Sequence, residues 1–391
     1  MRISFRITRI DGFALRMAIL YAAFFAFSGI QLPYFPAWLE ANGLDAREIG
    51  IVLAIPMLIR IIAVPFATRL IDRRFVHKTV LTVTAALSTV GYAIMGIAQG
   101  FPAIAAAYVA ISVVSAPLLP LADSYGLRGL NARGLAYGRV RLWGSVAFIL
   151  ANTIGGIFLA TLGAVDLIWV LTGAMAATAA ATLPLPGTPD GTQTIPNNHA
   201  GGGLWRSGLF VTTVVGASLI QASHAVMYGF VTLQWSAKGV GGTAIGLLWA
   251  IGVVAEILLF TASHRAIAHI GAVNMILLGG FGAILRWTAM AFDSPVALLP
   301  ILQCLHGLSF GATHLGAMHV LARLADRSGG ATAQGDFSAL QGVTFAAAMG
   351  LSGVLVERFG SSAYLAMSLV AAFGGVIVFG GRRSWREVDR V

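Results

Sequence analysis

Hydrophobic runs of about 20 residues or more recur along the whole chain, separated by short polar or Gly/Pro-rich breaks. About 20 apolar residues is the length at which an α-helix crosses a hydrocarbon core of roughly 30 Å. The pattern therefore predicts an all-α membrane protein with twelve transmembrane helices. The predicted spans are 12–38, 47–70, 78–98, 102–125, 138–161, 165–184, 207–235, 244–263, 271–292, 296–321, 334–356 and 361–381.

A long polar segment, LPLPGTPDGTQTIPNNHAGGG, divides the predicted spans into six plus six. It predicts an N-terminal six-helix bundle over 1–184, a cytoplasmic linker over 185–205 and a C-terminal six-helix bundle over 206–391. The linker is the one stretch of the sequence that combines length, polarity and many proline and glycine residues.

The two halves also resemble each other in sequence. Residues 42–60 align with residues 238–256 at a constant offset of 196, which pairs Gly50 with Gly246 and Arg60 with Glu256. Six-helix repeats related by an axis along the membrane normal are a known transporter plan, with the substrate site near the midplane between them. Arg60 and Glu256 are thus expected at similar depth, one cationic and one anionic.

Composition supports the membrane assignment. Hydrophobic residues make up 58% of the chain and charged residues 10%, and the mean hydropathy is +0.84. Soluble domains have about 45–50% apolar and about 25% charged residues. The single cysteine, Cys304, lies within a predicted span and has no partner, which excludes an intrachain disulfide framework.

The positive charges predict the orientation of the spans. Most lysines and arginines lie in alternate connections, which by the positive-inside rule face the cytoplasm together with both termini. The formal net charge of +10 is explained by this basic rim beside an anionic leaflet, so we expect a lipid bilayer and no nucleic acid as partner. The opposite connections carry only Arg47, Lys238 and Arg358.

Three ionisable residues, Glu256, Arg60 and Arg286, lie near the middle of predicted spans. A charge at the bilayer centre costs about 2.5–3.5 kcal/mol on insertion scales, so such residues usually face a cavity or a partner. Glu256 is interpreted as a functional carboxylate, with a structural clamp to an arginine as the alternative. The arginines fit a functional role, snorkelling or structural pairing equally well.

Polar residues also recur in the seventh and tenth spans. Gln221, His224 and Tyr228, at spacings of three and four, predict one polar helical face that lines a cavity, with interhelical hydrogen bonds as the alternative. His306 and His314 lie about 80° apart around a helix and roughly 12 Å along it. No metal site is expected from this spacing, and His306 is a candidate for proton handling or for plain interior hydrogen bonding.

Asp123, near the end of the fourth span, and Arg141, near the start of the fifth, predict a charge pair. Such a pair can exchange partners with a ligand. The alternative is an ordinary basic loop, which we favour for Arg139.

Six segments of the predicted spans together resemble those of a known family. They are SAPLLPLADSYG, YGRVRLWGSVAF, QASHAVMYGF, IGLLWAIGVVAEILLF, LRW and LQCLHGLSFGATHLGAM. With these segments the chain resembles, over essentially its whole length, the 3-phenylpropionate permease branch of the major facilitator superfamily, a relative of lactose permease and nucleoside:proton symporters. The resemblance implies two pseudo-symmetric bundles, proton-coupled symport by alternating access and a place in the bacterial inner membrane.

The resemblance also implies roles for single residues. Asp123 and Arg141 match the carboxylate and arginine that help to bind sugar in the lactose branch. Arg286 and His306 match that branch's ninth-helix arginine and tenth-helix histidine.

Two positions depart from the lactose pattern. Ser309 stands where the lactose branch has a carboxylate, and Phe148 stands where it has a tryptophan. Phenylalanine keeps a ring for stacking but lacks the indole N–H donor. Both departures favour a substrate other than a sugar.

We therefore expect a monomeric symporter for protons and a small organic anion such as an aromatic carboxylate. Arg60 or Arg286 is expected to meet the carboxylate of this anion. A sugar or nucleoside symporter and a proton-driven exporter are the alternatives. An enzyme or cofactor site is not expected, because no nucleophile or metal cluster is recognisable. The predicted proton-coupling residues are Glu256, His306 and Asp123, and the predicted substrate-binding residues are Arg60, Arg141, Phe148, Gln221, His224, Tyr228, Arg286 and His314.

Overall fold

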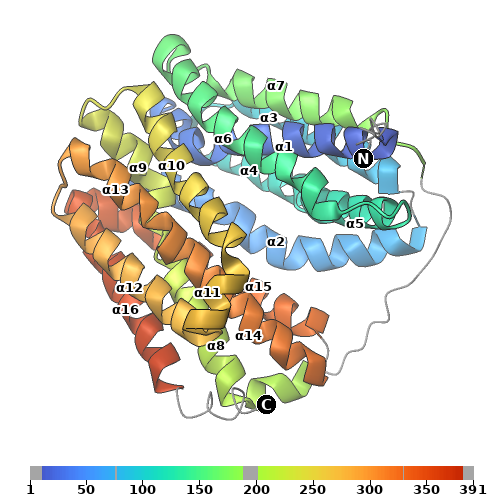
Figure 1. Ribbon diagram of the computed structural model, residues 1–391. Coiled ribbons are helices and arrows are strands. Elements are labelled where there is room, and N and C mark those ends of the chain that lie inside the picture. The colour runs from blue at the N-terminus through green and yellow to red at the C-terminus, as the bar shows by residue number, and fades with distance from the viewer. Residues whose placement is uncertain (1–10, 75–76, 188–200, 329, 382–391) are drawn as a thin grey trace, which may run out of the picture.

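The computed structural model describes residues 11–74, 77–187, 201–328 and 330–381, and every regular element in these ranges is a helix (Figure 1). The first half of the chain forms α1 (Gly12–Ala41), α2 (Ala46–Arg74), α3 (His77–Ile97), α4 (Gly100–Ser115), α5 (Leu118–Asn131), α6 (Tyr137–Leu162) and α7 (Leu167–Thr182).

The second half contains more and shorter elements. They are η1 (Gly201–Arg206), α8 (Gly208–Ala222), α9 (Ala225–Ala237), α10 (Gly242–Thr261), α11 (Ser263–Ile270), α12 (Ala272–Ala291), η2 (Val296–Leu298), α13 (Leu299–Cys304), the π-helix η3 (Gly307–Ala312), α14 (Thr313–Ser328), α15 (Gly330–Phe359), η4 (Gly360–Ser362) and α16 (Ala363–Gly380).

These helices combine into the twelve predicted spans, which confirms the all-α membrane fold. The pairs α4–α5, α8–α9 and α13–α14 each form one crossing, and the short α11 joins α10 to α12. Nine helical stretches in the described ranges are long and apolar enough to cross a membrane, one of which joins α15 and α16. Residues 188–200 of the predicted linker lie outside the described residues, and the division at 184 and 206 stays a prediction.

The seventh span departs from the expected continuous helix. It is broken between α8 and α9 at Ser223 and His224. The Ser223 hydroxyl donates to the Ile220 carbonyl at 2.6 Å and accepts a bond from the Trp287 indole at 2.9 Å. A serine hydroxyl that bonds the backbone offers an alternative to the helical pattern, and at Ser223 this bond is combined with the contact to an indole from another helix. Gln221 and Tyr228 therefore belong to two different helices.

The two ends of the molecule can be told apart by their connections. At the end called here the linker end, α1 begins, α7 ends, α8 begins and α16 ends (Figure 1). At the opposite end, called the far end, short turns join α1 to α2, α6 to α7, α9 to α10 and α15 to α16. In Figure 1 the first half lies above the second, and the two halves meet toward the far end.

Glycines bring the two halves together at the far end. A Cβ atom on Gly353 of α15 would come closer than 3.0 Å to the Ala46 carbonyl oxygen of α2. A Cβ on Gly156 of α6 would likewise clash with the Gly242 backbone of α10. Small residues allow such close backbone contact between membrane helices. We call these two contacts, α2 with α15 and α6 with α10, the glycine seams.

An ion pair crosses between the halves beside one seam. Arg47 of α2 and Glu357 of α15 approach to 2.6 Å between Nε and Oε2, and both side chains are exposed. The far end is therefore held by backbone packing together with one surface salt bridge.

Candidate functional site

A cavity of about 270 Å³ lies between the two halves. One wall comes from α1 and α6 of the first half, and the other comes from α9, α10, α13 and the residue before η3 in the second half. The lining residues are Phe25, Leu32, Arg141, Ser145, Phe148, Met227, Tyr228, Trp249, Gly252, Val253, Glu256, Gln303 and His306. The cavity thus depends on both halves.

Arg141 supplies the cation on the first wall. Its Nε lies 3.6 Å from Asp123 Oδ1, and its guanidinium lies 3.9 Å from the centre of the Phe25 ring. Tyr137 donates a hydrogen bond of 2.8 Å to the same Asp123 oxygen. The pair that the sequence predicted is therefore assembled. Asp123 itself does not line the cavity, so Arg141 connects Asp123 to the cavity wall.

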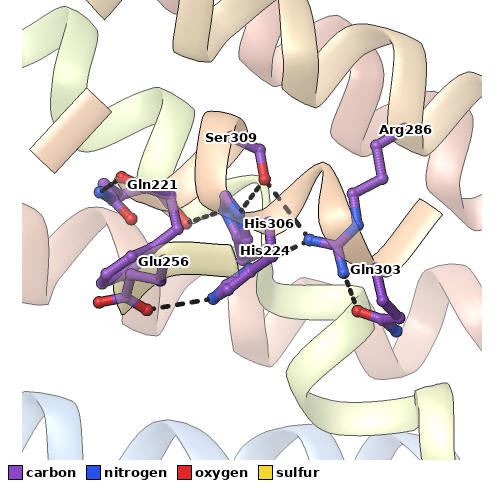
Figure 2. Close-up of polar contacts among 8 residues, drawn as sticks. Gln221, His224, Glu256, Arg286, Gln303, His306 and Ser309 are labelled. Carbon is purple, nitrogen blue, oxygen red and sulfur yellow. Dashed lines mark hydrogen bonds and ion pairs between the residues drawn. The ribbon is translucent and has the colours of Figure 1, made fainter. Parts of the chain in front are cut away.

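The opposite wall carries a polar network centred on Arg286 (Figure 2). Glu256 Oε2 lies 3.7 Å from His306 Nε2, and His306 Nδ1 lies 3.1 Å from an Arg286 nitrogen. Arg286 also donates to Gln303 Oε1 and, at 3.4 Å, to the Ser309 hydroxyl. Arg286 has no exposed surface, so it acts from behind the residues that form the wall.

The hydrogen-bond pattern fixes where His306 carries its proton. A guanidinium has only donors, so His306 Nδ1 must accept from Arg286. A neutral His306 therefore has its proton on Nε2, the nitrogen that faces Glu256. A second proton on Nδ1 would set N–H against N–H. Glu256 is consequently the group of this network best placed to gain or lose a proton at the cavity surface.

A second branch of the network leads from Arg286 to His224. Ser309 Oγ lies 3.1 Å from His224 Nε2, and His224 Nδ1 lies 3.1 Å from the Gln221 carbonyl oxygen. A carbonyl only accepts, so His224 Nδ1 carries the proton and Nε2 accepts from Ser309. Both branches thus point their donors away from Arg286. Among the described residues Arg286 has no direct ion pair with a carboxylate, and Glu256 is the acid that its network reaches.

Aromatic rings cover much of the remaining cavity wall. Tyr228 stacks on Trp249 at 5.9 Å with an interplanar angle of 16°, and the Trp249 indole donates to Thr232 at 3.1 Å. Phe25 and Phe148 lie on the wall of the first half. The cavity is therefore suited to a flat apolar group with a charged end.

The predicted site residues divide into three groups: those that line the cavity, those buried behind its wall, and those that lie further away. Arg141, Phe148, Tyr228, Glu256 and His306 line the cavity. Gln221, His224 and Arg286 are buried behind its wall and connect to it through hydrogen bonds.

Three predicted residues lie further away. His314 stacks on Phe310, which in turn stacks on His306. Asp123 touches Arg141 from outside the lining. Arg60 of α2 is exposed and does not line the cavity.

Sequence reasoning did not select Trp249 and Gln303, although both line the cavity. Each carried a detectable signal. Gln303 lies three residues before His306, and Trp249 lies seven residues before Glu256, so each shares a helical face with a residue that was selected.

Comparison with known proteins agrees with the all-helical membrane fold. Residues 14–366 match the MFS_1 like family. The chain is 28% identical to a probable 3-phenylpropionic acid transporter of Escherichia coli (strain K12), over 91% of this chain and 94% of the relative. It is 27% identical to a maltose permease of Geobacillus stearothermophilus, over 92% and 91%. The crystal structure of the nucleoside transporter NupG superposes with a TM-score of 0.81 at 17% identity, over 96% and 99%.

The fold and the central cavity define a multi-pass membrane transporter for a small molecule, and not an enzyme. The chain belongs to the MFS_1 like family. Its relatives transport chemically different substrates, so the substrate has to be argued from the cavity of this chain.

Proposed function

We propose that this transporter takes up a small aromatic carboxylate together with a proton. The observation that carries the proposal is the arrangement of one cavity with Arg141 on one wall and the network of Glu256, His306 and Arg286 on the other. The name of the Escherichia coli relative, a probable 3-phenylpropionic acid transporter, supports the same substrate class.

Arg141 is the arginine that we assign to the substrate carboxylate. The planar guanidinium matches a carboxylate with two parallel hydrogen bonds. Its present contact with Asp123 is a single approach of 3.6 Å and leaves donors for a ligand. The ring of the substrate would lie among Phe148, Tyr228 and Trp249. A cavity of about 270 Å³ is close to the lower end of ordinary ligand pockets, roughly 300 Å³, and suits a single-ring acid.

Glu256 is the residue that we assign to the coupled proton. In its ionised form it lies 3.7 Å from the His306 Nε2 and balances the buried charge of Arg286, which the imidazole contacts from its other side. An organic anion brings a second negative charge into the same cavity, and like charges at close range disfavour one another's ionised form. Substrate binding therefore favours protonation of Glu256. If only the empty carrier and the carrier with both proton and substrate change conformation, the proton gradient drives uptake.

The linker end is proposed to face the cytoplasm, in keeping with the positive charges of the sequence. The glycine seams close the far end, so the structure corresponds to a carrier that opens inward. Uptake then requires the halves to separate at these seams and to approach one another at the linker end.

The proposal is tested with purified protein in proteoliposomes and an imposed inward proton gradient. We expect accumulation of radiolabelled 3-phenylpropionate that a protonophore abolishes and that maltose and uridine do not inhibit. Protein-free liposomes correct for entry of the neutral acid through lipid. Gradient-driven uptake of maltose or uridine in place of the aromatic acid would contradict the assigned substrate, and accumulation that ignores the protonophore would contradict proton coupling.

Substitution of Arg141 by glutamine is expected to weaken binding of 3-phenylpropionate. Hydrogen bonds to a charged group contribute about 1.5–3 kcal/mol, which corresponds to an increase of the dissociation constant of about tenfold to a hundredfold. Isothermal titration of the purified variant measures the change. Arg139→Gln is the matched control, because Arg139 lies two residues earlier, is exposed and does not line the cavity. Equal weakening in both variants would show that Arg141 does not bind the substrate carboxylate.

A further inference from the structure

A second cavity, of about 210 Å³, lies at the far end of the second half and is called here the outer pocket. It is built from the end of α9, the segment after α12, the start of α13 and the start of α16. Its lining residues are Gln234, Trp235, Ala237, Lys238, Met290, Asp293, Ser294, Leu299, Ser361 and Tyr364. All of them belong to one half, so movement of the halves against each other does not take the pocket apart.

Two hydrogen-bond donors in the outer pocket have no partner. The Tyr364 hydroxyl and the Gln234 side-chain nitrogen are buried and make no hydrogen bond within the described part of the chain. Tyr364 is 1% exposed. Most buried polar atoms in proteins are paired, and leaving one unpaired is unfavourable. Two such atoms belong to residues that line one pocket, so a ligand with acceptor oxygens could satisfy both.

A lysine with a carboxylate already bound to it lies in the same lining. Lys238 forms an ion pair with Asp293, and Ser361 donates to the same Asp293 oxygen at 3.4 Å. Lys238 holds the pKa of the Asp293 carboxyl below its ordinary value, because the ionised carboxylate accepts the hydrogen bond of the ammonium. Asp293 has a φ of 56°, a left-handed conformation that is uncommon outside glycine. The pair shows that Lys238 can hold a carboxylate at this place.

The rest of the outer pocket is apolar. Trp235, Met290, Leu299 and the ring of Tyr364 form its walls. The described cation of the lining is Lys238, whose present partner is Asp293, and the two unpaired groups, the Gln234 amide nitrogen and the Tyr364 hydroxyl, can both donate. This combination selects for a negatively charged head with oxygen acceptors and for a hydrophobic body.

We propose that the outer pocket is a second binding site, which takes a small organic carboxylate with an apolar or aromatic body. The ligand carboxylate replaces Asp293 on the Lys238 ammonium. Gln234 and Tyr364 donate to the remaining oxygen lone pairs, and the apolar body packs against Trp235 and Met290.

One aromatic ring separates the outer pocket from the central network. Tyr364 stacks on Trp287 at 5.8 Å with an interplanar angle of 17°, and the Arg286 guanidinium lies 4.8 Å from the centre of the Trp287 ring. A ligand in the outer pocket thus contacts Tyr364, which stacks on the tryptophan next to Arg286. The inference does not rest on the proposed function, because the outer pocket is defined by its own residues.

Protection of a cysteine in the outer pocket tests the site. Ala237 is exposed and belongs to the lining, so an Ala237→Cys variant in a Cys304→Ser background can be labelled with a maleimide in nanodiscs. We expect 3-phenylpropionate and benzoate to slow labelling at least about tenfold at saturation, while the neutral 3-phenylpropionamide does not. A Val165→Cys variant, exposed at the far end of the first half, is labelled at the same rate with and without the acids.

Further variants separate the outer pocket from the central cavity. Lys238→Ala is expected to raise the protecting concentration about tenfold or more, because it removes a charge-assisted hydrogen bond. Tyr364→Phe keeps the ring and is expected to raise it by a smaller factor. Arg141→Gln is expected to leave protection unchanged. A single symmetric peak in size-exclusion chromatography reports whether each variant is folded. Protection that survives Lys238→Ala, or that disappears with Arg141→Gln, would overturn the proposal.

Discussion

Replacement of Glu256 by glutamine is expected to abolish accumulation of substrate against its gradient while exchange of substrate across the membrane continues. The glutamine side chain has nearly the same shape and keeps an oxygen that can face the His306 Nε2. It cannot take up or release a proton. The empty carrier and the substrate-loaded carrier then both change conformation without moving a proton, so substrate transport is no longer coupled to the proton gradient. The measurement compares gradient-driven uptake with counterflow in proteoliposomes, and uptake falls to simple equilibration.

A matched control for this variant is Asp123→Asn. Asp123 is the other carboxylate close to the cavity, but it contacts Arg141 from outside the lining. We expect the asparagine variant to change substrate affinity and to keep accumulation. The reverse pattern, with accumulation retained in Glu256→Gln and lost in Asp123→Asn, would assign the coupled proton to Asp123 in the first half of the molecule.

Replacement of Gly353 by valine is expected to hold the far end open and to stop transport. A Cβ at this position would come closer than 3.0 Å to the Ala46 carbonyl oxygen, which belongs to the backbone and cannot turn away. Overpacking costs about 1–3 kcal/mol, so the ratio of closed to open far ends falls about 5-fold to 150-fold. Spin labels on the two halves, at the exposed positions Val165 and Phe359, report the widening as a longer distance.

Gly350→Val provides the control on the same helix. A Cβ at Gly350 meets nothing within 4 Å, although the residue lies less than one turn from Gly353. Its distance distribution and transport rate should remain those of the unmodified protein. Equal loss in both variants would mean that valine harms α15 itself rather than the glycine seam.

Long hydrophobic runs made the twelve spans predictable, because hydropathy depends on the sequence alone. The break at Ser223 could not be predicted in the same way, since it involves an indole from α12, distant in the sequence. Helical periodicity also says which residues share a face but not which way that face points. The sequence therefore favoured Arg60 or Arg286 for the substrate carboxylate, and only the packed helices show that Arg141 is the arginine of the cavity wall.

The role of Arg286 illustrates a second limit. Its place in the middle of a span indicated a buried charge with a partner. The partners turned out to be uncharged groups, Gln303, His306 and Ser309, and the nearest acid is reached through the imidazole. Sequence patterns identify such residues one at a time. The order in which they are connected depends on side-chain positions from α10, α12 and the region around η3.

The ion pair of Arg47 and Glu357 has a consequence for the conditions under which the carrier works. An exposed pair contributes about 0–1 kcal/mol, and dissolved ions screen it. Backbone contact between uncharged glycines is not screened. The closure of the far end should therefore change little with ionic strength, and α2 and α15 would stay packed together in dilute as in salty surroundings.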